Sequence, residues 1–208
     1  MKPSRFLLFA ALLVVASPLL AQDHGHEHGH GHDHGHGEPG GMDAELAAFI
    51  EMAKPGAEHA FLEKLAGKWV AQGTFWQHPE APPTQTTGSS VNEMILDGRF
   101  LRSTYEGPSP LGDGEFTGVG LDGFDRIAGK YVGTWVDSFQ TMIMAFEGSV
   151  DASGKVRTLI AEYPSPMGGT AKMRTVTTIL NDDQFKYESF NVGEEGEMKA
   201  FEILYTRQ

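Results

Sequence analysis

Residues 87–106, TGSSVNEMILDGRFLRSTYE, decide the fold of this chain. Apolar and polar residues alternate on both sides of Asp97-Gly98, which is typical of strands that present one face to a core. Aspartate and glycine both tolerate positive φ, so this pair can close a tight hairpin between strands 87–96 and 99–106. The segment therefore predicts antiparallel strand pairing.

The same alternation continues through the rest of the chain, interrupted by turn-forming residues such as Asp151-Ala152-Ser153-Gly154. Ten candidate strands cover residues 68–78, 87–96, 99–106, 115–121, 130–139, 141–150, 156–163, 170–180, 185–192 and 197–206. No helix intervenes, so every neighbour is expected to be antiparallel. Closing the sheet removes its exposed edges, and we expect an all-β, up-and-down barrel of about ten strands at 67–208 that can enclose a small ligand.

Residues 42–66 precede the barrel and predict one or two short helices. The first is expected to carry Leu46, Phe49, Ile50 and Ala53 on one face and to end at Pro55-Gly56, and the second has Phe61, Leu62 and Leu65 on its apolar side. We expect both to pack on the barrel as a lid or plug.

Residues 1–21 have the three parts of a secretory signal peptide. Lys2 and Arg5 precede an apolar run at 6–16, and a short region ends at Ala21. The run is shorter than the roughly 20 residues that a membrane-spanning helix needs. We expect export to the periplasm or the medium, with cleavage after Ala21 or, alternatively, near Ala16 or Ser17, and no membrane attachment afterwards.

Residues 22–41 form a histidine-rich segment without apolar residues between Gln22 and Gly41, which predicts a disordered tail. Its seven histidines are His24, His26, His28, His30, His32, His34 and His36. Neutral imidazole is a good ligand for Zn²⁺, Cu²⁺ and Ni²⁺. Histidine has an ordinary pKa of about 6.5, so metal binding should weaken on acidification. The alternative is a polar spacer with no physiological metal.

Composition restricts the partners further. The formal net charge is −12, and it becomes more negative once Lys2 and Arg5 are removed, which disfavours nucleic acid and anionic lipid. The chain has no cysteine, so it contains neither disulfides nor a cysteine for lipid attachment. A barrel of this size needs no metal or other cofactor to fold.

Two sets of residues resemble known families. Gly67-Lys68-Trp69, with Arg207 placed to pack over the tryptophan, is similar to the calycin superfamily of lipocalins and fatty-acid carriers. Pro55-Gly56-Ala57-Glu58-His59, Gly98-Arg99-Phe100-Leu101, Tyr105-Glu106-Gly107 and Tyr131-Val132-Gly133-Thr134-Trp135-Val136-Asp137 together resemble domain-of-unknown-function family 1579. This resemblance covers about residues 53–207 and implies the barrel, but no activity.

The resemblance also bears on haem. Nitrobindin, a haem-binding relative in the same superfamily, uses a histidine near the C-terminal end, whereas this chain has none beyond His78. Haem is therefore not expected. A lipid-like or small aromatic ligand suits aromatic and methionine walls that carry a few polar groups.

The candidate ligand-binding residues are Trp69, Arg102, Tyr105, Tyr131, Trp135, Asp137, Met142 and Met144. Several have plainer alternatives. Arg102 and Arg174 could hold an anionic headgroup or lie on the solvated outer face. Asp137 could be an acid or base inside the barrel or cap a turn, and Met142 and Met144 could bind Cu(I) or fill the core.

The sequence contains none of the common enzyme motifs, and we assign no catalytic residue. The favoured hypothesis is an exported, non-enzymatic binding protein whose barrel takes a small apolar molecule and whose tail takes a divalent transition metal. The alternatives are an enzyme with a carboxylate acid or base inside the barrel, and a protein-interaction module with a filled barrel. The sequence leaves the oligomeric state open.

Overall fold

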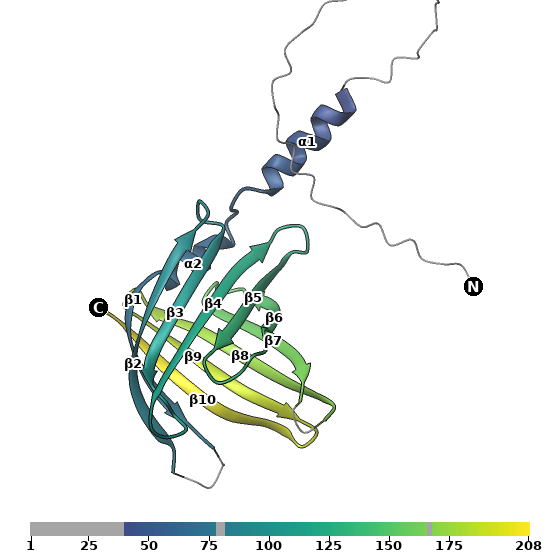
Figure 1. Cartoon of the computed structure of the whole chain (residues 1–208). Coiled ribbons are helices and arrows are strands. Elements are labelled where there is room, and N and C mark those ends of the chain that lie inside the picture. Colours follow the sequence, from purple (N-terminus) through teal and green to yellow (C-terminus); the bar gives the residue numbers. More distant parts are fainter. Residues whose placement is uncertain (1–39, 78–81, 166–167) are drawn as a thin grey trace, which may run out of the picture. The chain divides into compact units, whose positions relative to one another are not determined.

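The structure is a computed structural model that describes residues 40–77, 82–165 and 168–208. The predicted signal peptide and all seven histidines of the tail lie outside these residues. Ten antiparallel strands form one closed barrel, in which consecutive strands pair and β1 pairs with β10 (Figure 1). The strands are β1 (Gly67–Phe75), β2 (Thr84–Ile95), β3 (Phe100–Pro108), β4 (Glu115–Asp125), β5 (Lys130–Asp137), β6 (Met144–Val150), β7 (Val156–Pro164), β8 (Thr170–Asn181), β9 (Gln184–Gly193) and β10 (Gly196–Arg207). The prediction of an all-β antiparallel barrel is confirmed.

The β2–β3 hairpin lies where Asp97-Gly98 predicts it, but its loop is longer. Ile95 pairs with Phe100, so four residues connect the strands instead of two. Leu96, Asp97 and Gly98 all have positive φ, at 51°, 55° and 80°. An additional left-handed residue before Asp97 therefore closes the turn.

Two helices precede the barrel, α1 (Gly40–Met52) and α2 (His59–Leu65). In the described part of the chain, neither helix is long and apolar enough to cross a membrane. The prediction that both pack on the barrel is wrong for α1, because Leu46, Phe49 and Ile50 are 57%, 64% and 51% exposed. The barrel end is already filled by α2. At the C-terminal end of α1, Arg126 donates a hydrogen bond to the carbonyl oxygen of Glu51.

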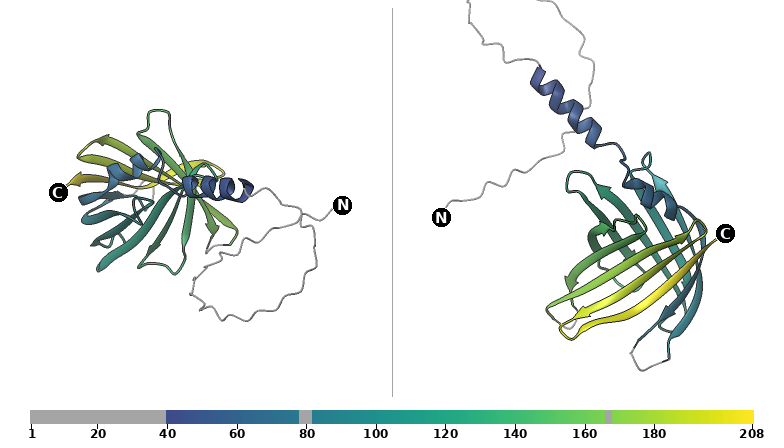
Figure 2. Two further views of the ribbon diagram at one scale, coloured as in Figure 1. Left: turned by 90° about the horizontal axis from the view of Figure 1, so that it is seen from above. Right: turned by 180° about the vertical axis from the view of Figure 1, so that it is seen from behind.

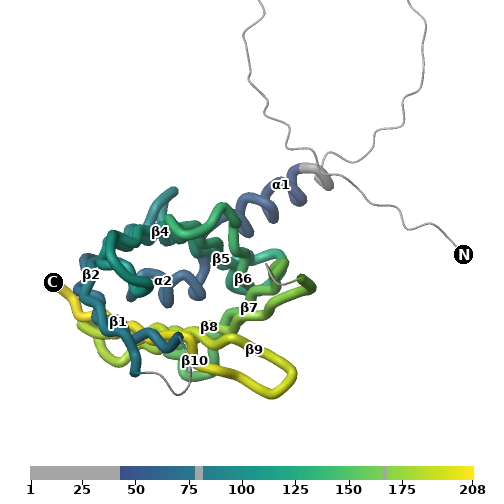
Figure 3. The backbone as a smooth tube through the Cα atoms, turned by 60° about the horizontal axis from the view of Figure 1, so that its bottom comes forward, coloured from purple at the N-terminus to yellow at the C-terminus, as the bar shows by residue number. Residues whose placement is uncertain are grey.

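The short helix α2 does close the barrel. It lies across the end from which β1 starts, called here the closed end, and in Figure 3 it lies inside the ring of strands (Figures 2 and 3). Phe61, Leu62 and Leu65 are 4%, 0% and 3% exposed, and they pack with Trp69 and Leu101 in the larger apolar core. The predicted plug is thus formed by the second helix alone.

The C-terminal end of α2 is fixed by side chains from three strands. Trp69 Nε1 and Asn92 Nδ2 both donate to the carbonyl oxygen of Leu65, at 3.0 and 2.9 Å. Arg207 Nη1 donates to the carbonyl oxygen of Ala66 at 3.0 Å. These contacts satisfy carbonyl groups that have no partner within the helix.

The predicted packing of Arg207 over Trp69 is also confirmed. The guanidinium carbon lies 4.1 Å from the centre of the tryptophan ring, which is the geometry of a cation–π contact. Gly67 is required beside this pair. It has a φ of 142°, and a Cβ atom there would lie 2.3 Å from Arg207 Nη1. The glycine of the Gly-x-Trp motif therefore provides space for the arginine.

We predict that Leu62→Ala destabilises the protein by about 2–5 kcal/mol, because it leaves a cavity under the plug. Leu46→Ala is the matched control, since the same substitution in exposed α1 removes no buried contact. Urea unfolding of both variants measures the difference. Equal stabilities for the two variants would contradict the role of α2 as a plug.

Candidate functional site

A cavity of about 450 Å³ lies inside the barrel. It extends from Leu65 of α2, at the closed end, to Leu111 and Phe139 in the β3–β4 and β5–β6 loops at the opposite, open end. Leu111 and Phe139 are 67% and 47% exposed, so the cavity reaches loops in contact with solvent. A space of this size can hold a small organic molecule.

The cavity wall follows from the alternation of side chains along the strands. Residues of β8, β9 and β10 at every second position face inward and are mostly aromatic, sulfur-containing or hydroxyl-bearing. They are Met173, Thr175, Thr177, Phe185, Tyr187, Phe201, Ile203 and Tyr205. The lining is therefore mainly apolar, with polar side chains at a few positions along the strands.

Trp135 of β5 forms a large part of the opposite wall, and two glycines of β4 provide space for it. A Cβ atom at Gly118 would lie 2.1 Å from the Trp135 ring, and one at Gly120 would lie 3.2 Å from it. Gly120 is the direct cross-strand partner of Trp135. The missing side chains on β4 thus allow the indole ring to lie against the wall.

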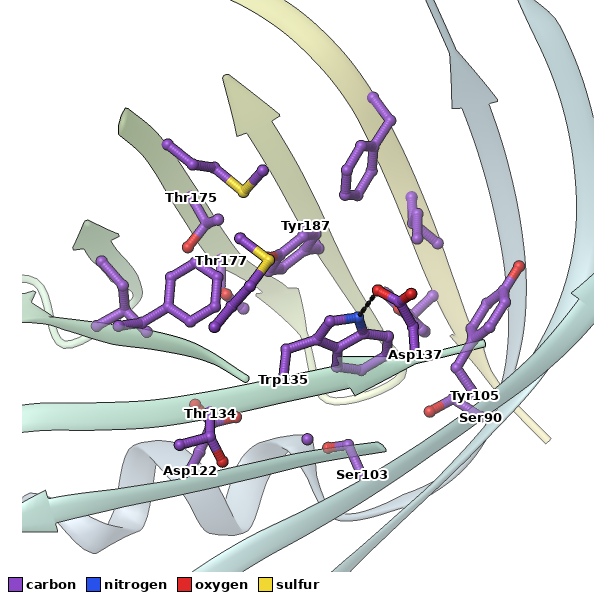
Figure 4. Close-up of a pocket in the computed structure, with 18 of the residues that line it drawn as sticks. Ser90, Ser103, Tyr105, Asp122, Thr134, Trp135, Asp137, Thr175, Thr177 and Tyr187 are labelled. Atoms are coloured by element: carbon purple, nitrogen blue, oxygen red, sulfur yellow. Dashed lines mark hydrogen bonds between the residues drawn. The ribbon is translucent and has the colours of Figure 1, made fainter. Parts of the chain in front are cut away.

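Asp137 orients Trp135 and the neighbouring loop. Its carboxylate accepts a hydrogen bond from Trp135 Nε1 at 3.0 Å (Figure 4). It also accepts from the backbone N–H of Phe139 at 2.9 Å and from Gln140 Nε2 at 3.1 Å. Both carboxylate oxygens are therefore engaged within the protein. This arrangement suits a structural role at the mouth of the cavity.

An ion pair between a buried arginine and a partly buried aspartate lies in the cavity wall. Arg157 of β7 is 4% exposed, and its Nη1 atom lies 3.1 Å from Asp122 Oδ1 of β4. A Cβ atom at Gly133 would lie 2.5 Å from the same oxygen, so the glycine opposite Asp122 provides space for the carboxylate. The ion pair joins walls that β5 and β6 separate along the sheet.

Three tyrosine hydroxyls add polar groups without adding charge. Burial raises the pKa of Tyr187 to about 12, and it also raises the pKa values of Tyr105 and Tyr205. All three side chains therefore stay protonated at physiological pH. Figure 4 shows Tyr187 with Thr175 and Thr177 on strands across from Trp135.

Four of the eight predicted ligand-binding residues line the cavity. They are Tyr105, Trp135, Asp137 and Met144. Trp69 and Tyr131 lie instead in the core at the closed end, where Tyr131 donates a hydrogen bond to the carbonyl oxygen of Glu58. Whether any of these residues binds a ligand remains a prediction.

The other two predicted residues, Arg102 and Met142, do not line the cavity. Arg102 lies on the outer face of β3 and pairs with Glu93, and Met142 lies in the β5–β6 loop. Arg174 is likewise on the outer face, paired with Glu197. These placements favour the solvated-face alternative for both arginines.

Sequence reasoning missed the Asp122–Arg157 pair and Tyr187. The sequence of β7 gives no signal for Arg157, because Val156 and Ile160 make the other face of the strand as apolar as the face that carries Leu159 and Ala161. Among the described residues, no three histidine, aspartate or glutamate side chains are grouped closely enough to hold a metal ion.

Comparison with known proteins gives a family and a fold. The model of the family described as "Protein of unknown function (DUF1579)" matches residues 54–207. No curated protein matches the chain in sequence. The crystal structure of Rv2717c from M. tuberculosis is similar, with 16% identity over 74% of this chain and 99% of that chain and a TM-score of 0.54.

Two further structures have lower TM-scores. A redesigned β-barrel, b11L5F_LGL, has 15% identity over 71% of this chain and 94% of that chain, with a TM-score of 0.39. EF1p2_mFAP2b bound to DFHBI has 12% identity over 73% of this chain and 100% of that chain, with a TM-score of 0.41.

We predict that Gly118→Ala displaces Trp135 and destabilises the protein by about 1–3 kcal/mol, because the added methyl group overlaps the indole ring. Near-ultraviolet circular dichroism reports the displacement. Gly193→Ala is the control, since a Cβ atom there has its nearest neighbour at 3.9 Å. An unchanged tryptophan spectrum in the Gly118 variant would show that Trp135 does not occupy this position.

Proposed function

Because this chain belongs to the DUF1579 family, whose description states no function, we propose a function from the barrel itself. The barrel binds a small, mainly apolar molecule, and the protein catalyses no reaction. The observation behind the proposal is the cavity of about 450 Å³ inside the barrel. Its aromatic and methionine walls offer apolar contact area, and a few convergent polar groups can orient a ligand.

Two alternatives are weaker on the same observations. A protein-interaction module with a filled barrel would leave no internal space of this size. An enzyme that used Asp137 as acid or base would need its carboxyl group free to reach a substrate. Instead, both carboxylate oxygens of Asp137 accept hydrogen bonds from neighbouring residues.

The proposal extends to export and to metal, on the sequence of residues 1–41. A signal peptide would deliver the protein to the periplasm or the medium, where the seven histidines could capture Zn²⁺, Cu²⁺ or Ni²⁺. A flexible chelate of this kind suits buffering or delivery of metal, because catalysis needs ligands in a fixed geometry.

Ligand binding is tested by filling the cavity from one wall. Ser103 lines the cavity, while the adjacent Thr104 is exposed on the outer face of β3. We predict that Ser103→Trp weakens binding of the neutral probe N-phenyl-naphthylamine by about tenfold or more, which is about 1.4 kcal/mol, whereas Thr104→Trp leaves it unchanged. Probe fluorescence and thermal unfolding are measured for both variants. Equal binding by the two folded variants would place the probe outside the barrel.

Metal binding is tested on the untagged processed protein. We predict that calorimetry with Zn²⁺ shows binding at pH 7.5 that is largely lost at pH 5.5, since protonated imidazole cannot coordinate a metal ion. The control variant has asparagine in place of all seven tail histidines and should bind weakly at both values. Undiminished binding by that variant would remove the metal role from the tail.

A further inference from the structure

Arg157 is a buried cation whose hydrogen-bonding groups are not all satisfied. The side chain lines the cavity and is 4% exposed, and neither Nε nor Nη1 has a hydrogen-bond partner among the described residues. Nη1 lies 3.1 Å from Asp122 Oδ1 as an ion pair, but without hydrogen-bond alignment. A buried donor without an acceptor is costly, so this position favours a ligand that supplies one.

The charge at this level of the cavity is already balanced. Asp122 neutralises Arg157, and the neighbouring Tyr187 phenol is uncharged, since its ordinary pKa already lies well above neutral pH and burial raises the pKa further, to about 12. A ligand carboxylate would therefore bring a third, uncompensated charge into a mainly apolar cavity, and it would lie near Asp122. Desolvating that charge opposes binding.

Hydroxyl groups on the adjacent strands lie beside Arg157 and enlarge the polar part of the cavity wall. Thr177 is the direct cross-strand partner of Arg157 on β7 and of Tyr187 on β9, so the three residues form one row across adjacent strands. Thr177 and Tyr187 also line the cavity. Apolar residues lie beside the row, with Leu159 on β7 and Phe185 on β9. The row is thus a local polar site within a mainly apolar wall.

We propose that the row Arg157–Thr177–Tyr187, with Asp122, recognises a neutral carbonyl group, as in a ketone, ester or amide, on an otherwise apolar ligand. This inference rests on the proposed binding function and specifies its ligand class. A carbonyl oxygen accepts from Arg157 without disturbing the charge balance. A hydrocarbon leaves Arg157 unsatisfied, and a carboxylate adds an unbalanced charge.

The test uses three probes of nearly the same shape, substituted at the same ring carbon: acetylnaphthalene, isopropylnaphthalene and naphthoate. Their dissociation constants are measured by calorimetry for the wild-type protein and for Asp122→Leu/Arg157→Met, which replaces the buried pair with apolar side chains of similar size. Because each free probe is the same in both titrations, the change in the ketone-to-hydrocarbon preference isolates the contribution of the pair.

We expect the wild-type preference for the ketone over the hydrocarbon to fall about tenfold or more in the double variant. We also expect naphthoate to bind wild type about tenfold more weakly than the ketone. Asp122→Asn should narrow or reverse this second difference, because it removes the negative charge and keeps Arg157. If Asp122→Asn does not fold, the ketone-to-hydrocarbon preference of the double variant tests the carbonyl site by itself. The double variant is expected to fold, since replacing both charges leaves no unpaired ion.

The outcomes separate this inference from the proposed function. If isopropylnaphthalene binds and the double variant leaves the preference unchanged, the carbonyl site is wrong while the apolar binding function stands. If naphthoate binds wild type as tightly as the ketone, the requirement for a neutral group is wrong. If none of the three probes binds the folded wild-type protein, both the inference and the proposed binding function are overturned.

Discussion

Three side chains that bind the last carbonyl groups of α2 hold the closed end of the barrel together. Trp69 comes from β1, Asn92 from β2 and Arg207 from β10, so one helix end joins three strands that are adjacent in the sheet. The seam between β1 and β10 is where the first and last strands meet. The positive guanidinium of Arg207 also lies at the helix end that carries partial negative charge, which adds to the attraction. Closure of the sheet and seating of the plug are therefore coupled.

Much of this arrangement could be predicted from the sequence because its causes are local. Alternation fixes the strands, and turn residues fix their ends, so all ten strands were located with shifts at their boundaries. The packing of Arg207 on Trp69, by contrast, was expected from the resemblance to the calycin superfamily, because two residues so far apart in the sequence give no local signal. The failure at α1 has a different cause: an apolar helix face shows that burial is favourable, but it does not show whether a surface is available. The shorter helix α2 covers the apolar surface at the closed end of the barrel.

The cavity was predictable only in part, for a geometric reason. Alternation groups Trp135 with Asp137 on one face and Met142 with Met144 on another, but it does not show which face turns inward, and only Met144 of the two methionines lines the cavity. Arg102 and Arg157 could not be distinguished by the same rule, since each is a charged residue in an otherwise ordinary strand. What separates them is the partner. Arg102 pairs with Glu93 on the adjacent β2, whereas Arg157 on β7 pairs with Asp122 on β4, a strand that β5 and β6 separate from it in the sheet.

The buried pair is hard to explain by stability alone. Removing two charges from water is expensive, and apolar residues of similar volume often stabilise a protein as well or better. The same strands do place apolar residues next to this level, as Leu159 on β7 and Phe124 on β4 show. An apolar wall would therefore have been continuous without Asp122 and Arg157. Their cost is better explained if the cavity has to distinguish one end of a ligand from the other, because a ligand oxygen can supply the acceptor that Arg157 does not find among the described residues.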